Sequence, residues 1–131
     1  MKGNMSPIGL TTNMLISHAE EFHGKTEIVS VDVKGARRRT NWGEVGSRSR
    51  KLSSALVKLG LKKGDRVGTI APNTSEHLEL LYAISGFGGV AHTINPRLFP
   101  DEVVYIINHA CDRILFVDPA YVGILIGHRH L

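Results

Sequence analysis

The sequence predicts an α/β fold in which helices and strands alternate and the strands form a mostly parallel sheet. Three observations predict it. Apolar residues recur at helical spacing in segments that end at Gly or Pro, short apolar runs lie between those segments, and 42% hydrophobic content is enough for a buried core. Strands that alternate with helices form βαβ units, which place neighbouring strands parallel.

The first elements predicted are a helix and two short strands. Thr11 or Thr12 can cap the helix, and Gly24 ends it. We expect four apolar residues of this helix to face the core: Leu15, Ile16, Ala19 and Phe22. Strands follow at 27–31 and 36–40, with Lys34-Gly35 as the turn between them.

A longer amphipathic helix is predicted from Trp42 to Leu59, with Gly60 as its C-cap. Its basic residues lie mostly away from one apolar side. That side consists of Val45, Leu52, Ala55, Leu56 and Leu59.

The second half predicts three strands and two helices. Strands are expected at 66–71, 90–93 and 113–117. An N-cap within 73–75 begins a helix that ends in the glycines at 86, 88 and 89. Pro100 begins the other helix at a favoured first-turn position, and Asp118-Pro119 ends the last strand.

Net charge is +4 and is unevenly distributed. The segment 34–66, here called the basic block, contains eleven Lys and Arg residues but only Glu44 and Asp65 as acids. Such a block can bind nucleic acid or an anionic membrane surface. Trp42 is its only aromatic residue, and no DNA- or RNA-binding motif is present. We therefore interpret it as solvated helix faces and turns, and expect no nucleic-acid partner.

The single cysteine, Cys111, cannot form an internal disulfide and has no metal-ligand spacing around it, so we expect a buried structural thiol. The first ten residues lack a continuous apolar region, so no signal peptide is predicted. The longest uncharged stretch, 80–96, contains three glycines and a terminal proline, which disfavours a membrane span. A cytoplasmic location is predicted, and peripheral membrane association stays open.

The segment Gly86-Phe87-Gly88-Gly89-Val90-Ala91 matches the G-x-G-x-x-A pattern of dinucleotide-binding folds. That site needs a strand before the pattern and a helix after it. Here the order is reversed, which predicts a tight connection between a helix and a strand. His128 and His130 have no nearby Asp, Glu or Cys, and the carboxylates that are adjacent in sequence diverge. We predict no catalytic, cofactor-binding or metal-binding residue in this chain.

The segment 92–100, His-Thr-Ile-Asn-Pro-Arg-Leu-Phe-Pro, stands out. It leaves the carboxyl end of a strand, where open α/β sheets place ligands. The alternative is that Asn95 and Arg97 tie the loop to neighbouring backbone. We interpret His92, Asn95, Pro96 and Arg97 as a candidate structural loop.

Residues 10–122 together resemble the N-terminal part of medium- and long-chain fatty acyl-CoA ligases, which are AMP-binding, adenylate-forming enzymes. The turn Gly64-Asp65-Arg66-Val67 is common to much of that superfamily. The segments HTINPRL (92–98) and YIINHA (105–110) are typical of the fatty-acyl branch.

The resemblance implies that a carboxylic acid and ATP react, with the assistance of Mg²⁺, to give an acyl-adenylate and pyrophosphate. The CoA thiol then attacks the adenylate to give the thioester. It also implies a fatty acid as substrate and homodimerisation through the N-terminal region. The family's phosphate loop, adenine motif, ribose-binding aspartate and catalytic lysine are not among these 131 residues. No family role therefore transfers to a residue here, and we expect the chain alone to be inactive.

Residues 123–131 depart from the family pattern. We predict an incomplete N-terminal subdomain at 1–122 and an aberrant or truncated tail at 123–131, arising from truncation, a frameshift or a gene-prediction error. The alternative function is an independent, non-catalytic basic α/β module that binds nucleotides or RNA. A self-sufficient domain would end with a capped element, and this sequence does not.

Overall fold

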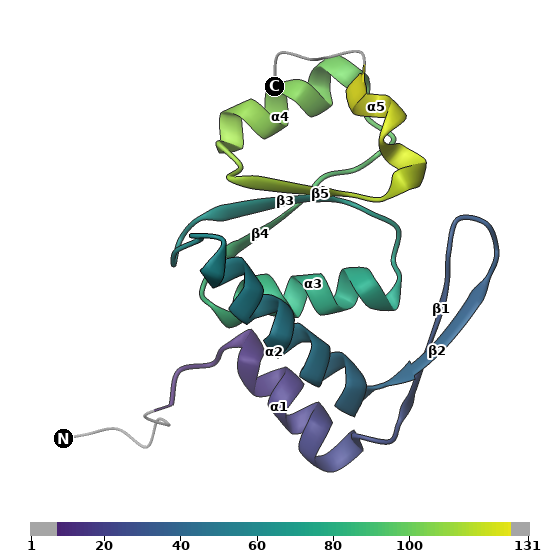
Figure 1. Ribbon diagram of the computed structural model, residues 1–131, viewed down its shortest axis with the longest axis vertical. Helices are drawn as coiled ribbons and strands as arrows, with labels where there is room; N and C mark the ends of the chain where they lie inside the picture. Colours follow the sequence, from purple (N-terminus) through teal and green to yellow (C-terminus); the bar gives the residue numbers. More distant parts are fainter. Residues whose placement is uncertain (1–7, 127–131) are drawn as a thin grey trace.

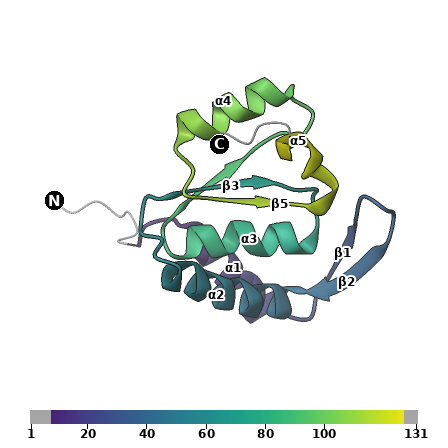
Figure 2. The ribbon, with the colours of Figure 1, turned by 45° about the horizontal axis from the view of Figure 1, so that its top comes forward.

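A parallel sheet of three strands separates two layers of helices in the computed structural model, which describes residues 8–126 (Figure 1 and Figure 2). The strand order is β4-β3-β5, from β3 (Arg66–Ile70), β4 (Val90–Thr93) and β5 (Ile114–Val117). One face is covered by α2 (Trp42–Lys58) and α3 (Ser75–Gly86), and the other by α4 (Pro100–Ala110) and α5 (Gly123–Ile126). The predicted α/β class and parallel sheet are confirmed.

Each face of the sheet has its own hydrophobic cluster. The cluster on the α3 side consists of Leu56, Leu61, Val67, Leu80, Ala83 and Ile84. The cluster on the α4 side consists of Ile70, Ile94, Val103 and Ile107, with Ile124 and Leu125 of α5 packed against it. Alternation along β3 sends Val67 to the first cluster and Ile70 to the second. Strand β3 is therefore buried on both faces.

An antiparallel hairpin stands outside the sheet, at the side of the molecule (Figure 1). Its strands are β1 (Glu27–Val31) and β2 (Arg37–Asn41). In the turn between them, Oδ1 of Asp32 accepts hydrogen bonds from the backbone N–H groups of Lys34 and Ala36. Gly35 has φ of 83°, a conformation that favours glycine. The hairpin ends at Asn41, which caps α2 by accepting from the N–H of Glu44 at 2.9 Å.

The predicted helices and strands are all present, with ends that shift by no more than one residue. The 3₁₀ turn η1 (Pro119–Tyr121) and α5 were not predicted. Because Ile124 and Leu125 pack with the α4-side cluster, residues 123–126 are part of the packed structure. The domain boundary at residue 122 stays a prediction. Within residues 8–126, no helix has the length and apolar character needed to cross a bilayer.

The prediction of the core was wrong for several helix residues. Leu15 and Phe22 are exposed, because α1 (Thr12–His23) packs on the outer sides of α2 and α3 and buries only Ile16. Ala55 lies on the solvent side of α2, and Leu59 is the C-cap residue beyond its last turn, so both are exposed.

The prediction of a buried thiol was also wrong. Cys111 is exposed at the C-cap of α4, where the backbone is left-handed with φ of 53°. This conformation turns the chain out of α4 toward β5. The exposure of Cys111 thus follows from its place in the turn that ends α4.

Gly68, at the centre of β3, is in register with His92 on β4 and Leu115 on β5. A Cβ atom at this position would lie 2.6 Å from Cδ1 of Leu115 and 2.8 Å from Oδ2 of Asp112. The side chains of Leu115 and Asp112 therefore occupy the space above the glycine. The close approach of Leu115 and Asp112 to the backbone of β3 requires a residue without a side chain at position 68.

We predict that Gly68→Ala lowers the free energy of unfolding by about 1–3 kcal/mol, because Leu115 and Asp112 must move to admit the methyl group. Urea denaturation followed by circular dichroism measures the effect. Gly123→Ala is the matched control, since no atom lies within 4 Å of its Cβ position. Equal midpoints for the Gly68 variant and the unmodified chain would contradict the steric argument.

Candidate functional site

The loop after β4 is held together largely by its own residues. Ile94 is buried, and its N–H donates to the carbonyl of Thr69 at 2.9 Å. Oδ1 of Asn95 accepts from the N–H of Arg97 at 3.0 Å, which forms a local Asx-type turn. The N–H of Phe99 donates to Oε2 of Glu102 at 3.0 Å and closes the loop onto the start of α4. The backbone after β4 is thereby fixed.

His92 lies in β4 and contributes to a partly buried polar pair on the α4 face. Its Nδ1 lies 2.8 Å from Oδ2 of Asp112, whose side chain is 1% exposed. Asp112 lies two residues before β5, so the pair spans β3 above Gly68 and joins the two outer strands. Oδ1 of Asp112 has no hydrogen-bond partner among residues 8–126.

A second polar pair lies on the α3 face of the same strand. Nε2 of His77 is 3.0 Å from Oγ1 of Thr69, and both residues are buried. Burial lowers the pKa of His77 below its ordinary value of 6.5, and a hydrogen bond with the backbone of Pro72 opposes the shift. The neutral ring is therefore favoured, with Nε2 accepting from the Thr69 hydroxyl.

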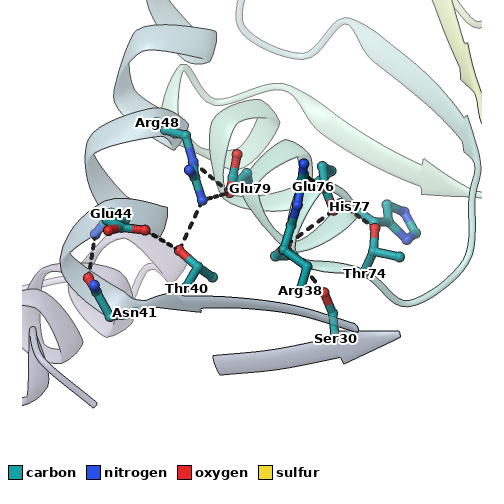
Figure 3. A network of polar contacts seen from close by, with 11 residues as sticks. Ser30, Arg38, Thr40, Asn41, Glu44, Arg48, Thr74, Glu76, His77 and Glu79 are labelled. Carbon is teal, nitrogen blue, oxygen red and sulfur yellow. Dashed lines mark hydrogen bonds and ion pairs between the residues drawn. The ribbon is translucent and has the colours of Figure 1, made fainter. Parts of the chain in front are cut away.

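A polar network joins the hairpin to α2 and α3 (Figure 3). Arg48 donates from Nε to Oε1 of Glu79 at 2.9 Å, and from Nη2 to Oγ1 of Thr40 at 3.0 Å. The Thr40 hydroxyl donates in turn to Oε2 of Glu44 at 2.6 Å. The Glu79 side chain is only 12% exposed, so Arg48 compensates a largely buried charge.

Four arginines of the basic block form ion pairs with carboxylates. The pairs are Arg38–Glu76, Arg39–Glu27, Arg48–Glu79 and Arg50–Glu20. Four of the eleven basic residues of the block are thus paired within the protein.

A cleft of about 400 Å³ lies between α1, α2 and α3. Hydroxyl groups of Ser17, Ser49 and Ser53 line it, and Arg50 at its side is paired with Glu20. The Ser49 hydroxyl is buried without a partner among the described residues. No base stands beside these hydroxyls in the cleft lining to activate one of them as a nucleophile.

A sequence model of AMP-binding enzymes matches residues 15–129. The chain belongs to the AMP-binding enzyme family. It is 53% identical over 129 residues to a 3-methylmercaptopropionyl-CoA ligase of Ruegeria lacuscaerulensis. It is 47% identical over 125 residues to a medium-chain-fatty-acid–CoA ligase of Ectopseudomonas oleovorans. These matches cover 98% and 95% of this chain but 24% and 23% of the relatives, so the chain spans about a quarter of their length.

Solved structures of CoA ligases share the fold. The anthranilate CoA ligase AuaEII superposes with a TM-score of 0.82 at 21% identity, covering 98% of this chain and 24% of that one. The fatty acyl CoA synthetase of Mycobacterium tuberculosis gives 0.72 at 23% identity, with coverage of 88% and 24%. At these identities the likeness shows the fold alone.

In this AMP-binding segment, the four residues of the predicted loop do not converge on one point. His92 pairs with Asp112 across β3, Asn95 bonds within the loop, and Pro96 is half-buried. The guanidinium of Arg97 is exposed and has no hydrogen bond or ion pair with residues 8–126. The structural role of the loop stays a prediction. Asp112 was missed because its partner lies 20 residues away in sequence.

Two other predictions can be placed. The G-x-G-x-x-A pattern follows α3 and opens β4, and Gly88 has φ of 82° in the connection, so it is not arranged as a dinucleotide-binding turn. Within residues 8–126 no three His, Cys, Asp or Glu side chains are grouped to hold a metal ion. His128 and His130 lie outside the described residues.

We predict that the stability of the AMP-binding segment falls on acidification below about pH 6.5. Because the pKa of His77 is lowered in the folded state, the unfolded chain binds a proton more readily in the window below 6.5. The contribution of His77 to the free energy of unfolding is fully present above pH 6.5. It is lost as the pH falls from 6.5 through the lowered pKa of His77 in the folded state. Urea midpoints at pH 7.5 and 5.5 measure it. His77→Gln should reduce the pH dependence, and an unchanged slope would contradict the assignment.

Proposed function

We propose that this chain is the N-terminal part of an acyl-CoA ligase, in which it supplies scaffold and no catalytic group. The observation that carries the proposal is the identity of 53% and 47% to two CoA ligases over nearly the whole chain. The AMP-binding family implies ATP and CoA as co-substrates of the full-length enzyme. The reaction would join the acid to AMP with release of pyrophosphate, and the CoA thiol would then displace AMP.

Residues 8–126 offer no grouped metal ligands for Mg²⁺ and no phosphate-binding turn at the glycine-rich segment. The described part contains no cluster of three metal-binding side chains, and its glycine-rich segment opens a strand, so its N–H groups are not presented by a helix N-terminus. No step of the reaction is therefore assigned to a residue here. ATP, Mg²⁺ and CoA would be held by the remainder of the ligase.

A fatty acid of medium chain length is the proposed substrate, because the Ectopseudomonas oleovorans relative carries that activity in its name. The Ruegeria lacuscaerulensis relative, named for 3-methylmercaptopropionate, indicates that a short thioether acid is a second candidate. We further propose homodimerisation through this region, as the resemblance to fatty acyl-CoA ligases implies. We also propose a cytoplasmic location, since the sequence predicts neither a signal peptide nor a membrane span. The RNA- or nucleotide-binding alternative is not favoured, since the chain matches CoA ligases over nearly its whole length.

The chain alone should show no acid-dependent exchange between ATP and pyrophosphate, because removing one oriented oxyanion donor alone costs about 100- to 1,000-fold in rate. A chimera in which this chain replaces the matched segment of the Ruegeria lacuscaerulensis ligase should form CoA thioesters. The unmodified Ruegeria enzyme is the positive control. Exchange by the isolated chain, or a folded chimera without thioester formation, would contradict the proposal.

Arg97→Ala should leave the unfolding free energy of the isolated chain within about 0.5 kcal/mol, because its guanidinium is exposed there. In the chimera the same change should lower stability by about 1–3 kcal/mol, the usual cost of leaving buried polar partners unpaired, with KM for ATP and acid nearly unchanged. Thermal melts measure the effect on stability, and steady-state kinetics measure the effect on KM. A large rise in KM without loss of stability would make Arg97 a substrate-binding residue.

A further inference from the structure

The hairpin of β1 and β2 has two faces of different character. Residues that lie opposite one another in an antiparallel pair share a face, so the register assigns each side chain. Figure 3 shows Ser30, Arg38 and Thr40 directed toward α2 and α3. The other face, here called the outer face, presents five exposed residues: Glu27, Val29, Val31, Arg37 and Arg39.

The inner face holds the hairpin in this orientation. The Ser30 hydroxyl donates to Oγ of Ser75 at 3.3 Å, and Arg38 forms an ion pair with Glu76. The hydrogen bonds of Thr40 described above tie β2 to α2 and α3. Because these contacts are all on one side, the outer face is turned toward solvent.

The outer face combines apolar and cationic side chains at neighbouring positions. Val29 lies opposite Arg39, and Val31 lies opposite Arg37. Each of the two valines is 49% exposed. An arginine side chain has an apolar stem and carries its charge at the far end, so it can lie beside a valine and still reach an anion. The turn adds one more half-exposed valine and one more cation, Val33 and Lys34.

The positive charge of the protein is concentrated in this hairpin. Segment 25–41 contains five Lys and Arg residues and two acids, which gives it a net charge of +3 out of +4 for the whole chain. Within residues 8–126, Lys34 and Arg37 form no ion pair. The carboxylates near them are already engaged, Glu27 with Arg39, Glu76 with Arg38, and Asp32 and Asp118 with backbone N–H groups.

We propose that the outer face and the turn of this hairpin form a docking surface for an anionic lipid bilayer. The interface of a bilayer offers phosphate groups to the cations and an acyl boundary to the valines in the same plane. A nucleic acid would leave the valines without an apolar counterpart, and segment 25–41 has no aromatic residue to stack on bases. The proposal goes beyond the proposed function and does not depend on it.

Sedimentation with lipid vesicles tests the proposal. The chain should bind vesicles of phosphatidylcholine that contain about one third phosphatidylglycerol, and should bind pure phosphatidylcholine vesicles roughly tenfold more weakly or less. Raising NaCl from about 0.05 M to about 0.5 M should release it from the anionic vesicles. Equal binding to both kinds of vesicle, or tighter binding to a single-stranded RNA than to the anionic vesicles, would overturn the proposal.

Charge variants locate the surface. Lys34→Gln combined with Arg37→Gln should weaken binding to the anionic vesicles roughly 30-fold, since each cation near such a surface contributes about fivefold. The matched control is Lys58→Gln combined with Lys62→Gln. It removes the same charge at the far end of α2, roughly 25 Å along the helix from the hairpin, and should change binding less than about twofold. An equal loss in both double variants would mean that net charge alone decides binding, and the hairpin would lose its role.

The apolar part of the surface has its own test. Val29→Thr combined with Val31→Thr keeps the branched side chains that suit a strand and leaves the charge unchanged. This double variant should bind the anionic vesicles several-fold more weakly, because its outer face no longer offers methyl groups to the acyl boundary. Urea midpoints equal to that of the unmodified chain confirm that the variant is folded. Unchanged affinity in the folded variant would contradict docking through this face.

A fluorescent probe in the turn gives a measurement that does not depend on affinity. Val33→Cys in a Cys111→Ser background accepts an environment-sensitive fluorophore at a single thiol, because Cys111 is the one cysteine of the sequence. Its emission should shift to shorter wavelength on anionic vesicles. The same fluorophore on Lys58→Cys is the control and should not shift. A shift at position 58 without one at position 33 would place the contact elsewhere.

The chimera described above separates this surface from the proposed function. It should bind anionic vesicles as the isolated chain does. Binding by the isolated chain alone would mean that the remainder of the ligase covers the outer face, and the proposal would fail. A chimera that forms thioesters without binding vesicles leaves the proposed function intact. A chimera that binds vesicles without forming thioesters supports the docking surface while the proposed function fails.

Discussion

Burial of β3 between two layers of helices is the constraint on which the rest of this structure depends. A strand enclosed on both faces leaves no solvent for a polar side chain, and an unpaired buried group costs about 1–3 kcal/mol. The sequence meets this requirement differently on each face. Thr69 is paired with His77 on the α3 side, while Gly68 leaves room on the α4 side for the pair of His92 and Asp112.

Local sequence signals were sufficient to predict the elements and the parallel sheet. Apolar spacing, Pro100 at a helix start, and glycines at helix ends act over a few residues, so they can be read without knowledge of the packing. The same signals failed for Leu15 and Phe22. Periodicity identifies the apolar face of a helix, but it does not tell how much of that face a neighbouring element covers.

The candidate loop shows the same limit at longer range. The bond of Asn95 to nearby backbone follows from an Asx turn, which needs only adjacent residues. The partner of His92 depends on the order of strands, because Asp112 reaches it only if β5 lies across β3 from β4. Gly68, His92 and Asp112 are distant in sequence, and Gly68 lies between the other two in the sheet. All three had to be placed together before the pair of His92 and Asp112 could be recognised.

The two sides of the sheet are completed to different degrees. On the α3 side, α1, α2 and the hairpin are joined by ion pairs such as Arg48–Glu79, which fixes these helices against β3. On the other side, α4 is followed by only the short α5, beside the open edge of β5. Local opening is least costly where few contacts must break, so it should begin at β5 and α5.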